Sequence, residues 1–177
     1  MRKTIGVVLC TVVALSAAVV LLGQARKRIS PHEKTSGMIG GTSITIEYGR
    51  PYKKGRQIFG GLEAFGKVWR TGADEATKLT TEDDVMIGSI HVPKGTYSLF
   101  TIPGEKEWTL VLNKVASQWG AFKYDQKSDL GRTPMKVETS PSTIEQLTIA
   151  IEPAGGRSGV LKVMWDTTTA SAPIMVH

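Results

Sequence analysis

The sequence predicts an all-β fold: an antiparallel β-sandwich or jelly roll of about nine strands with a short helical turn, preceded by an N-terminal hydrophobic segment. Three observations support this fold class. Apolar residues recur in short runs, several of which alternate with polar residues. Glycine- and proline-containing turns separate these runs, and no long segment has the 3.6-residue period of an amphipathic helix. Because the chain has 177 residues and shows no linker or repeat after Gly41, we expect one domain over residues 42–177.

The first element is an apolar run over residues 5–22 that follows Arg2 and Lys3. A charged start, an apolar stretch and then small residues predict a signal peptide over residues 1–25. The run is also nearly long enough to cross a bilayer, so a retained N-terminal membrane anchor is the alternative. Both interpretations predict an exported protein, periplasmic or extracellular. Cys10, the single cysteine, lies within the run, so the exported part has no thiol.

The positive charge of the chain is concentrated at its beginning. The sequence has 22 Lys and Arg residues against 16 Asp and Glu residues, a formal net charge of +6. Five of the basic residues lie within the first 28 positions, which hold no acidic residue, and 17 basic residues face 16 acidic ones in the remainder. A nearly neutral domain gives no electrostatic reason to expect a nucleic-acid partner. Membrane contact is expected only through an uncleaved N-terminal segment.

The predicted strands follow a polar lead over residues 26–41. In the first strand, residues 42–48, the side chains of Ile44, Ile46 and Tyr48 share one face. The later strands have similar alternation or short apolar runs between turns. They are residues 85–87, 90–92, 96–102, 108–112, 135–138, 144–151, 160–165 and 173–176.

A glycine-rich stretch over residues 55–73 interrupts the series of strands. Its apolar residues have helical spacing between Phe59 and Phe65, although Gly60 and Gly61 weaken a helix there. We therefore expect a short helical turn near residues 59–65, followed by a strand at residues 67–70. Such a loop would cover the open end of a sandwich.

The candidate ligand-binding residues lie in and around this stretch. Three arginines lie beside residues that influence the backbone conformation. Pro51 follows Arg50, Gly55 precedes Arg56, and Thr71-Gly72 follow Arg70. Converging guanidinium groups would bind a carboxylate, phosphate or sulfated ligand. Alternatively, the arginines pair internally with acidic residues of the same region: Glu47, Glu63, Asp74 or Glu75. Glu75 and Trp119 complete the predicted ligand-binding set.

Catalytic and metal chemistry have weaker support in the sequence. The carboxylates of Asp74 and Glu75 suit acid–base hydrolysis, but neighbouring residues of a strand point to opposite faces, so a distant partner would be required. His32, His91 and His177 form no metal-binding motif, and no nucleotide-binding or nucleophile motif is present. We therefore predict no metal and no cofactor.

The tryptophans divide between core and surface. Trp108 and Trp165 lie in alternating strands and are expected in the core. Trp119 lies in a glycine-containing connection and is the better candidate for a surface that stacks on a sugar. Packing in the core remains the alternative for each of them.

Several separated motifs, in one order, resemble a single bacterial family, domain of unknown function 2911. The resemblance covers nearly all of residues 30–177 and implies an exported setting, without an established activity or catalytic residues. Its motifs are Tyr48-Gly49-Arg50-Pro51, Lys54-Gly55-Arg56, Ile58-Phe59-Gly60-Gly61-Leu62, Gly66-Lys67-Val68-Trp69-Arg70-Thr71-Gly72-Ala73, Glu75-Ala76-Thr77, Gly95-Thr96-Tyr97-Ser98-Leu99-Phe100-Thr101-Ile102-Pro103 and Gln118-Trp119-Gly120.

Together these features favour a noncatalytic exported module that binds a small or oligomeric ligand, anionic or carbohydrate, through residues 50–75. The alternatives are a hydrolase that uses carboxylates near Asp74 and Glu75, and a structural protein of the cell envelope. The geometry of the arginines distinguishes them, because binding requires an open pocket beside the guanidinium groups.

Overall fold

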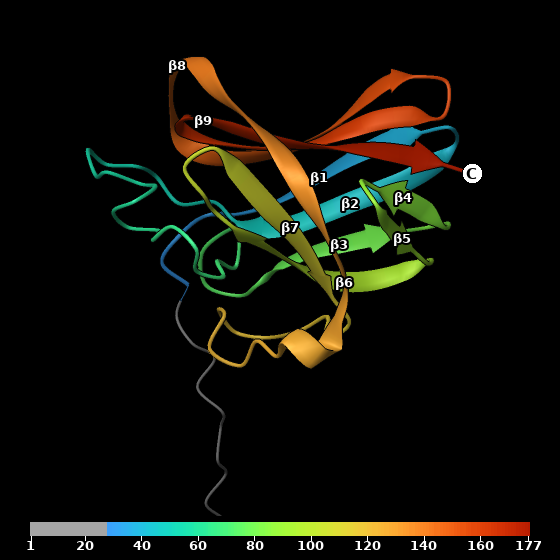
Figure 1. Ribbon diagram of the computed structural model, residues 1–177, viewed down its shortest axis with the longest axis horizontal. Coiled ribbons are helices and arrows are strands. Elements are labelled where there is room, and N and C mark those ends of the chain that lie inside the picture. The colour runs from blue at the N-terminus through green and yellow to red at the C-terminus, as the bar shows by residue number, and fades with distance from the viewer. Residues whose placement is uncertain (1–27) are drawn as a thin grey trace, which may run out of the picture.

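The computed structural model describes residues 28–177, which form nine antiparallel strands in one sheet (Figure 1). The strand order is β1-β2-β3-β6-β7-β8-β9-β4-β5. The described residues contain one 3-10 turn, η1, at Gln126–Ser128. This architecture confirms the all-β, antiparallel prediction. The strands are β1 His32–Ile39, β2 Thr42–Gly49, β3 Thr77–Thr81, β4 Val85–Ile87, β5 Ile90–Val92, β6 Gly95–Ile102, β7 Glu107–Asn113, β8 Asp129–Gly155 and β9 Ser158–Val176.

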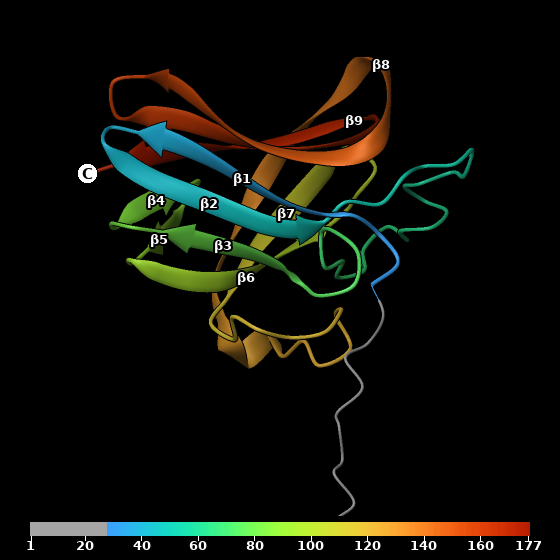
Figure 2. The same ribbon diagram turned by 180° about the vertical axis from the view of Figure 1, so that it is seen from behind.

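The sheet curves so that strands distant in its order face one another. Figures 1 and 2 show the β8–β9 hairpin beside β1 and β2, and β1 contacts both β8 and β9. The two layers approach closely at Gly37 of β1, where an added Cβ would lie 2.4 Å from the Cγ2 atom of Ile151 in β8. A side chain at position 37 would therefore clash, and glycine allows the two layers to pack as in a sandwich.

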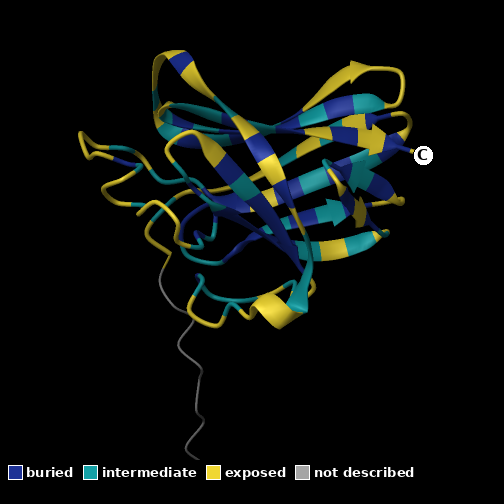
Figure 3. Cartoon of the chain, viewed as in Figure 1, coloured by how far each residue is buried: buried dark blue, intermediate teal, exposed yellow. Residues whose placement is uncertain are grey.

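One main hydrophobic core lies between the layers. It includes Ile44 and Ile46 of β2, Leu110 of β7 and Val163 of β9, each at most 1% exposed. Exposed residues concentrate at the hairpin tips and in the loops (Figure 3). The burial of β2 alternates over its first part, as its sequence predicted. Apolar side chains from both layers are thus removed from water, which is the main favourable contribution to folding.

Two strands were not anticipated. Residues 32–39, within the expected polar lead, form β1 and pair along their whole length with β2 through a turn at Gly40 and Gly41. Both glycines have positive φ, 56° and 90°, which side-chain-bearing residues rarely adopt. The boundary at residue 42 was therefore wrong for the start of the sheet. β3 was missed because Thr77 and Thr81 are its buried residues, beside Leu79.

The glycine-rich stretch has a different local structure from the one expected. Residues 59–65 form turns and no helix, because Gly60 and Gly66 have φ values of 78° and 72°, outside the helical region. Residues 67–70 form no strand, and only Trp69 makes an isolated antiparallel bridge, to Thr101 of β6. The 3-10 turn lies elsewhere, between β7 and β8.

The predicted signal peptide or anchor over residues 1–25, including its apolar run at 5–22, lies outside the described residues. Within residues 28–177, no helix has the length and apolar composition needed to cross a membrane.

Candidate functional site

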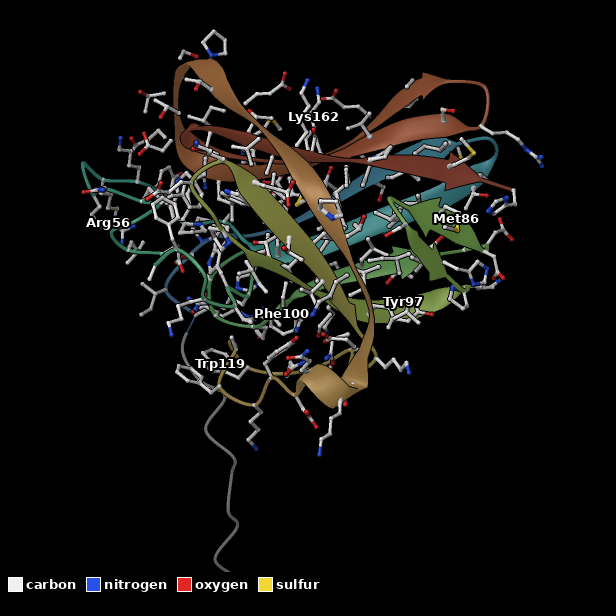
Figure 4. All side chains as sticks on the ribbon, in the orientation of Figure 1. Arg56, Met86, Tyr97, Phe100, Trp119 and Lys162 are labelled. Atoms are coloured by element: carbon white, nitrogen blue, oxygen red, sulfur yellow. The ribbon has the colours of Figure 1, made fainter. Side chains whose placement is uncertain are left out.

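The connection between β2 and β3 forms one wall of a pocket of about 430 Å³, which we call the arginine pocket. Its lining includes five charged side chains from this connection and the buried ring of one tryptophan from β9. Arg56, one of these charged residues, is labelled in Figure 4. The charged residues are Lys54, Arg56, Glu63, Arg70 and Asp74, and the tryptophan is Trp165.

The connection is fixed to the sheet at both of its ends. The backbone N–H of Lys53 donates to Glu145, and the N–H of Leu147 donates to Pro51, so the first part lies along β8. Trp69 exchanges backbone hydrogen bonds of 2.8 and 3.0 Å with Thr101 of β6. The pocket wall is therefore held by β8 on one side and β6 on the other.

Backbone strain is concentrated in the same connection. Lys54, Thr71 and Asp74 have φ values of 49°, 54° and 64°, and Thr71 is β-branched, which makes positive φ especially unfavourable there. The Thr71 side chain is buried and bonds Thr101, while its carbonyl accepts from Thr77 at 2.8 Å. Strained residues held by surrounding contacts are found most often at binding and catalytic sites.

The three predicted arginines have different environments. Arg50 does not line the pocket: its guanidinium donates to the Leu147 carbonyl, the Thr148 hydroxyl and the Glu33 carboxylate at 2.7–2.9 Å. These bonds join the end of β2 to β8 and β1. Arg50 thus follows the internal-pairing interpretation, although its acidic partner, Glu33, was not among those predicted.

Arg56 and Arg70 both line the pocket. The exposed Arg56 donates to the carbonyls of Lys53 and Tyr52 on its own loop. The Nε atom of Arg70 is buried and has no hydrogen-bond partner among residues 28–177. A buried donor without an acceptor costs about 1–3 kcal/mol.

Glu63 is a pocket residue whose pKa is strongly shifted. Burial raises its pKa from 4.5 to about 7, against the opposing effects of Arg70 and Arg56. Near neutral pH the carboxyl therefore titrates between an uncharged and a charged form, which changes the charge of the pocket. The sequence placed Glu63 only among possible arginine partners. An acidic residue within an apolar, glycine-rich run was the signal that it would be partly buried.

Asp74 and Glu75 converge on one histidine. The His32 Nε2 atom lies 3.2 Å from Asp74 Oδ2 and 3.5 Å from Glu75 Oε2. The expectation that they point to opposite faces was wrong, because Asp74 is in a positive-φ turn and not in a strand. Only Asp74 also lines the pocket.

Glu75 does not line the arginine pocket and instead contacts the first described residue. Arg28 donates two hydrogen bonds to Glu75 Oε1, at 2.7 and 3.0 Å. Burial acts to raise the pKa of Glu75, but the hydrogen bonds from Arg28 and the positive charge hold it below its usual value. The carboxylate therefore remains ionised at neutral pH as the partner of Arg28.

Trp119, which is labelled in Figure 4, lies in the loop between β7 and β8 and lines a second hollow of about 640 Å³. Val115, Phe122 and Lys123 also line it. Trp119 forms an isolated antiparallel bridge with Glu75, so the backbones of the two predicted site residues are neighbours. Their side chains nevertheless line different hollows.

The other three tryptophans pack in the core beneath the arginine pocket. Trp69 stacks on Trp165 with centroids 5.9 Å apart, and Phe59 meets Trp108 edge-on at 4.6 Å. This confirms the core placement of Trp108 and Trp165. Trp165 is the ring among them that lines the pocket, and the packed rings around it restrict its movement.

Within residues 28–177, no three potential metal-binding side chains of the His, Cys, Asp or Glu type are grouped closely enough to hold an ion.

Comparison with known proteins gave one match. Neither the curated proteins nor the solved structures include a match to this chain. A family model described as protein of unknown function (DUF2911) matches residues 30–174. This span includes the lining of the arginine pocket apart from Ile29, the Trp119 hollow and all strands except the final residues of β9. The chain therefore belongs to the DUF2911 family.

Proposed function

We propose that this protein is an exported, noncatalytic module that binds a small anionic ligand in the pocket lined by Arg70, Arg56 and Lys54. The observation that supports it most directly is the Arg70 Nε donor, which is buried without a partner among the described residues and belongs to a pocket-lining side chain. A carboxylate or phosphate oxygen is the acceptor that matches a guanidinium best.

The charges of the pocket lining support an anion as the ligand. Three basic side chains line the pocket against two carboxyls, and one of these, Glu63, is partly protonated near neutral pH. The Asp74 carboxylate is 8% exposed and is directed to His32 and the Ser30 N–H, so it is already occupied by donors. The pocket volume suits a metabolite-sized ligand.

The direct test is calorimetric titration of the full chain with inorganic phosphate and with citrate. Arg70→Gln should weaken the binding of the anion about 10- to 100-fold, because a hydrogen bond to a charged group contributes about 1.5–3 kcal/mol. Arg157→Gln, which changes an exposed arginine outside the pocket lining, is the matched control and should leave affinity unchanged. Equal affinities for the two variants, or no binding of either anion to the wild type, would contradict the proposal.

Hydrolysis is the second candidate, supported by Glu63 and Asp74 lining the same pocket. A carboxyl with a pKa of about 7 and a paired carboxylate are the groups that acid–base catalysis requires. In this case Glu63→Gln would abolish cleavage of a chromogenic glycoside. Under the binding proposal, the wild type cleaves none of these substrates.

A further inference from the structure

We propose that the loop between β7 and β8, residues 114–128, is a membrane-contact surface that inserts its apolar side chains into the headgroup region of an anionic bilayer. The proposal is independent of the arginine pocket, since the residues that carry it line a separate hollow.

The loop exposes apolar side chains side by side. Phe122 is 84% exposed and Val115 is 46% exposed, and both line the hollow that contains Trp119. Single exposed apolar residues are common, whereas several around one hollow indicate a binding surface. Tryptophan is enriched where proteins meet the bilayer interface, because its ring is apolar and its N–H is polar. In Figure 3 this loop and η1 project below the sheet.

The charges of the loop suit an anionic surface. Lys114, Lys123 and Lys127 are exposed, and Asp125 is the exposed acidic residue among them. The Asp125 carboxylate accepts from the backbone N–H of Lys127. Lysines beside exposed aromatic and aliphatic side chains are the composition of an interfacial lipid-binding segment.

The start of the described chain lies next to this loop. Arg28 bonds Glu75, and Glu75 pairs with Trp119. Figures 1 and 2 both show the first described residues on the same side of the sheet as the loop. The apolar run ends at residue 22, and six residues of extended chain span at most about 20 Å. An apolar run embedded in a bilayer would therefore hold the loop close to the membrane surface.

The test uses the intrinsic fluorescence of the full chain with vesicles that contain brominated phosphatidylglycerol. Trp69, Trp108 and Trp165 are at most 3% exposed, so quenching by the brominated lipid reports mainly Trp119. We expect quenching in the wild type and its loss in Trp119→Phe. Quenching should weaken when phosphatidylglycerol is replaced by brominated phosphatidylcholine, because the lysines then lose their anionic partners.

Phe122→Ser should reduce the quenching by about twofold or more, because it removes the most exposed apolar side chain of the loop. Met38→Ser is the matched control: Met38 is 59% exposed on β1, outside the loop, and its change should leave quenching unaltered. Both variants should keep the wild-type thermal midpoint, since both side chains are exposed. Unquenched Trp119 in anionic vesicles, or equal quenching in the Phe122 and Met38 variants, would overturn the proposal. Quenching abolished by a soluble sugar would assign the hollow to carbohydrate and would also overturn it.

Discussion

Replacing Glu63 by glutamine should remove a pH-dependent loss of stability. Glutamine keeps the size of the side chain but cannot ionise. In the wild type, burial raises the pKa of Glu63 from 4.5 to about 7. Between these two values the folded chain binds this proton more tightly than the unfolded chain, so the free energy of unfolding falls as the pH rises. Below pH 4.5 the carboxyl is protonated in both states, and above about pH 7 it is ionised in both, so the loss is then complete.

The magnitude follows from the difference between the two pKa values. At about 1.4 kcal/mol per pH unit, the full difference corresponds to about 3 kcal/mol. Because Glu63 is only partly buried, water screens part of this energy, and we expect an observed loss of about 1–2 kcal/mol. Glu63→Gln should therefore be more stable than the wild type at pH 8 and similar to it at pH 5.

Urea unfolding at pH 5 and pH 8, followed by tryptophan fluorescence, measures both free energies. Glu105→Gln changes an exposed glutamate outside the pocket and is the matched control, with the wild-type pH dependence. Sulfate, which keeps its charge over this range, should bind the wild type less tightly at pH 8 because ionised Glu63 then competes for Arg70 and Arg56. If Glu63→Gln and Glu105→Gln show the same difference between pH 5 and pH 8, the explanation based on Glu63 is refuted.

Two further variants separate the structural residues from the binding residues. Arg50→Ala should lower the free energy of unfolding by about 2–3 kcal/mol, because it removes three hydrogen bonds, while anion affinity stays unchanged. Urea unfolding and phosphate titration check this, with Arg157→Ala as the control, and a loss of affinity without a loss of stability would reverse the assignment. Gly49→Ala should cost about 1–3 kcal/mol, because its Cβ would lie within 2.2 Å of the Ala73 carbonyl oxygen, beside the Asp74 turn. An unchanged thermal midpoint would show that this turn adjusts freely.

The strands with alternating apolar residues could be predicted from the sequence because each local pattern matches its buried face. In β2, Ile44, Ile46 and Tyr48 are all buried, as the alternation indicated. β1 carries no such pattern: Met38 is exposed, and Ile39 is its one buried residue. Its structure depends on pairing with β2, which is a tertiary property of the chain.

The candidate site could be predicted only in part. The sequence brought Arg56 and Arg70 together because both belong to one short, glycine-rich connection. It could not separate Arg50 from them, because the carbonyl that holds Arg50 belongs to Leu147, 97 residues away. The raised pKa of Glu63 depends on its burial in the folded chain, and the convergence of Asp74 and Glu75 depends on a positive-φ turn. The apolar, glycine-rich run around Glu63 indicated partial burial, but neither the size of the pKa shift nor the positive φ of Asp74 can be derived from a local pattern.

The long hairpin of β8 and β9 has a consequence for the order of folding. The first part of the pocket wall is held by β8 at residues 145–147, and Trp165 of β9 forms part of the pocket lining. Contacts between segments so distant in sequence form slowly, because closing the intervening chain loses much conformational entropy. The lining of the arginine pocket is therefore brought together only after nearly the whole chain has been synthesised and the hairpin has docked. A chain truncated before β9 would lack Trp165 and therefore part of the pocket lining.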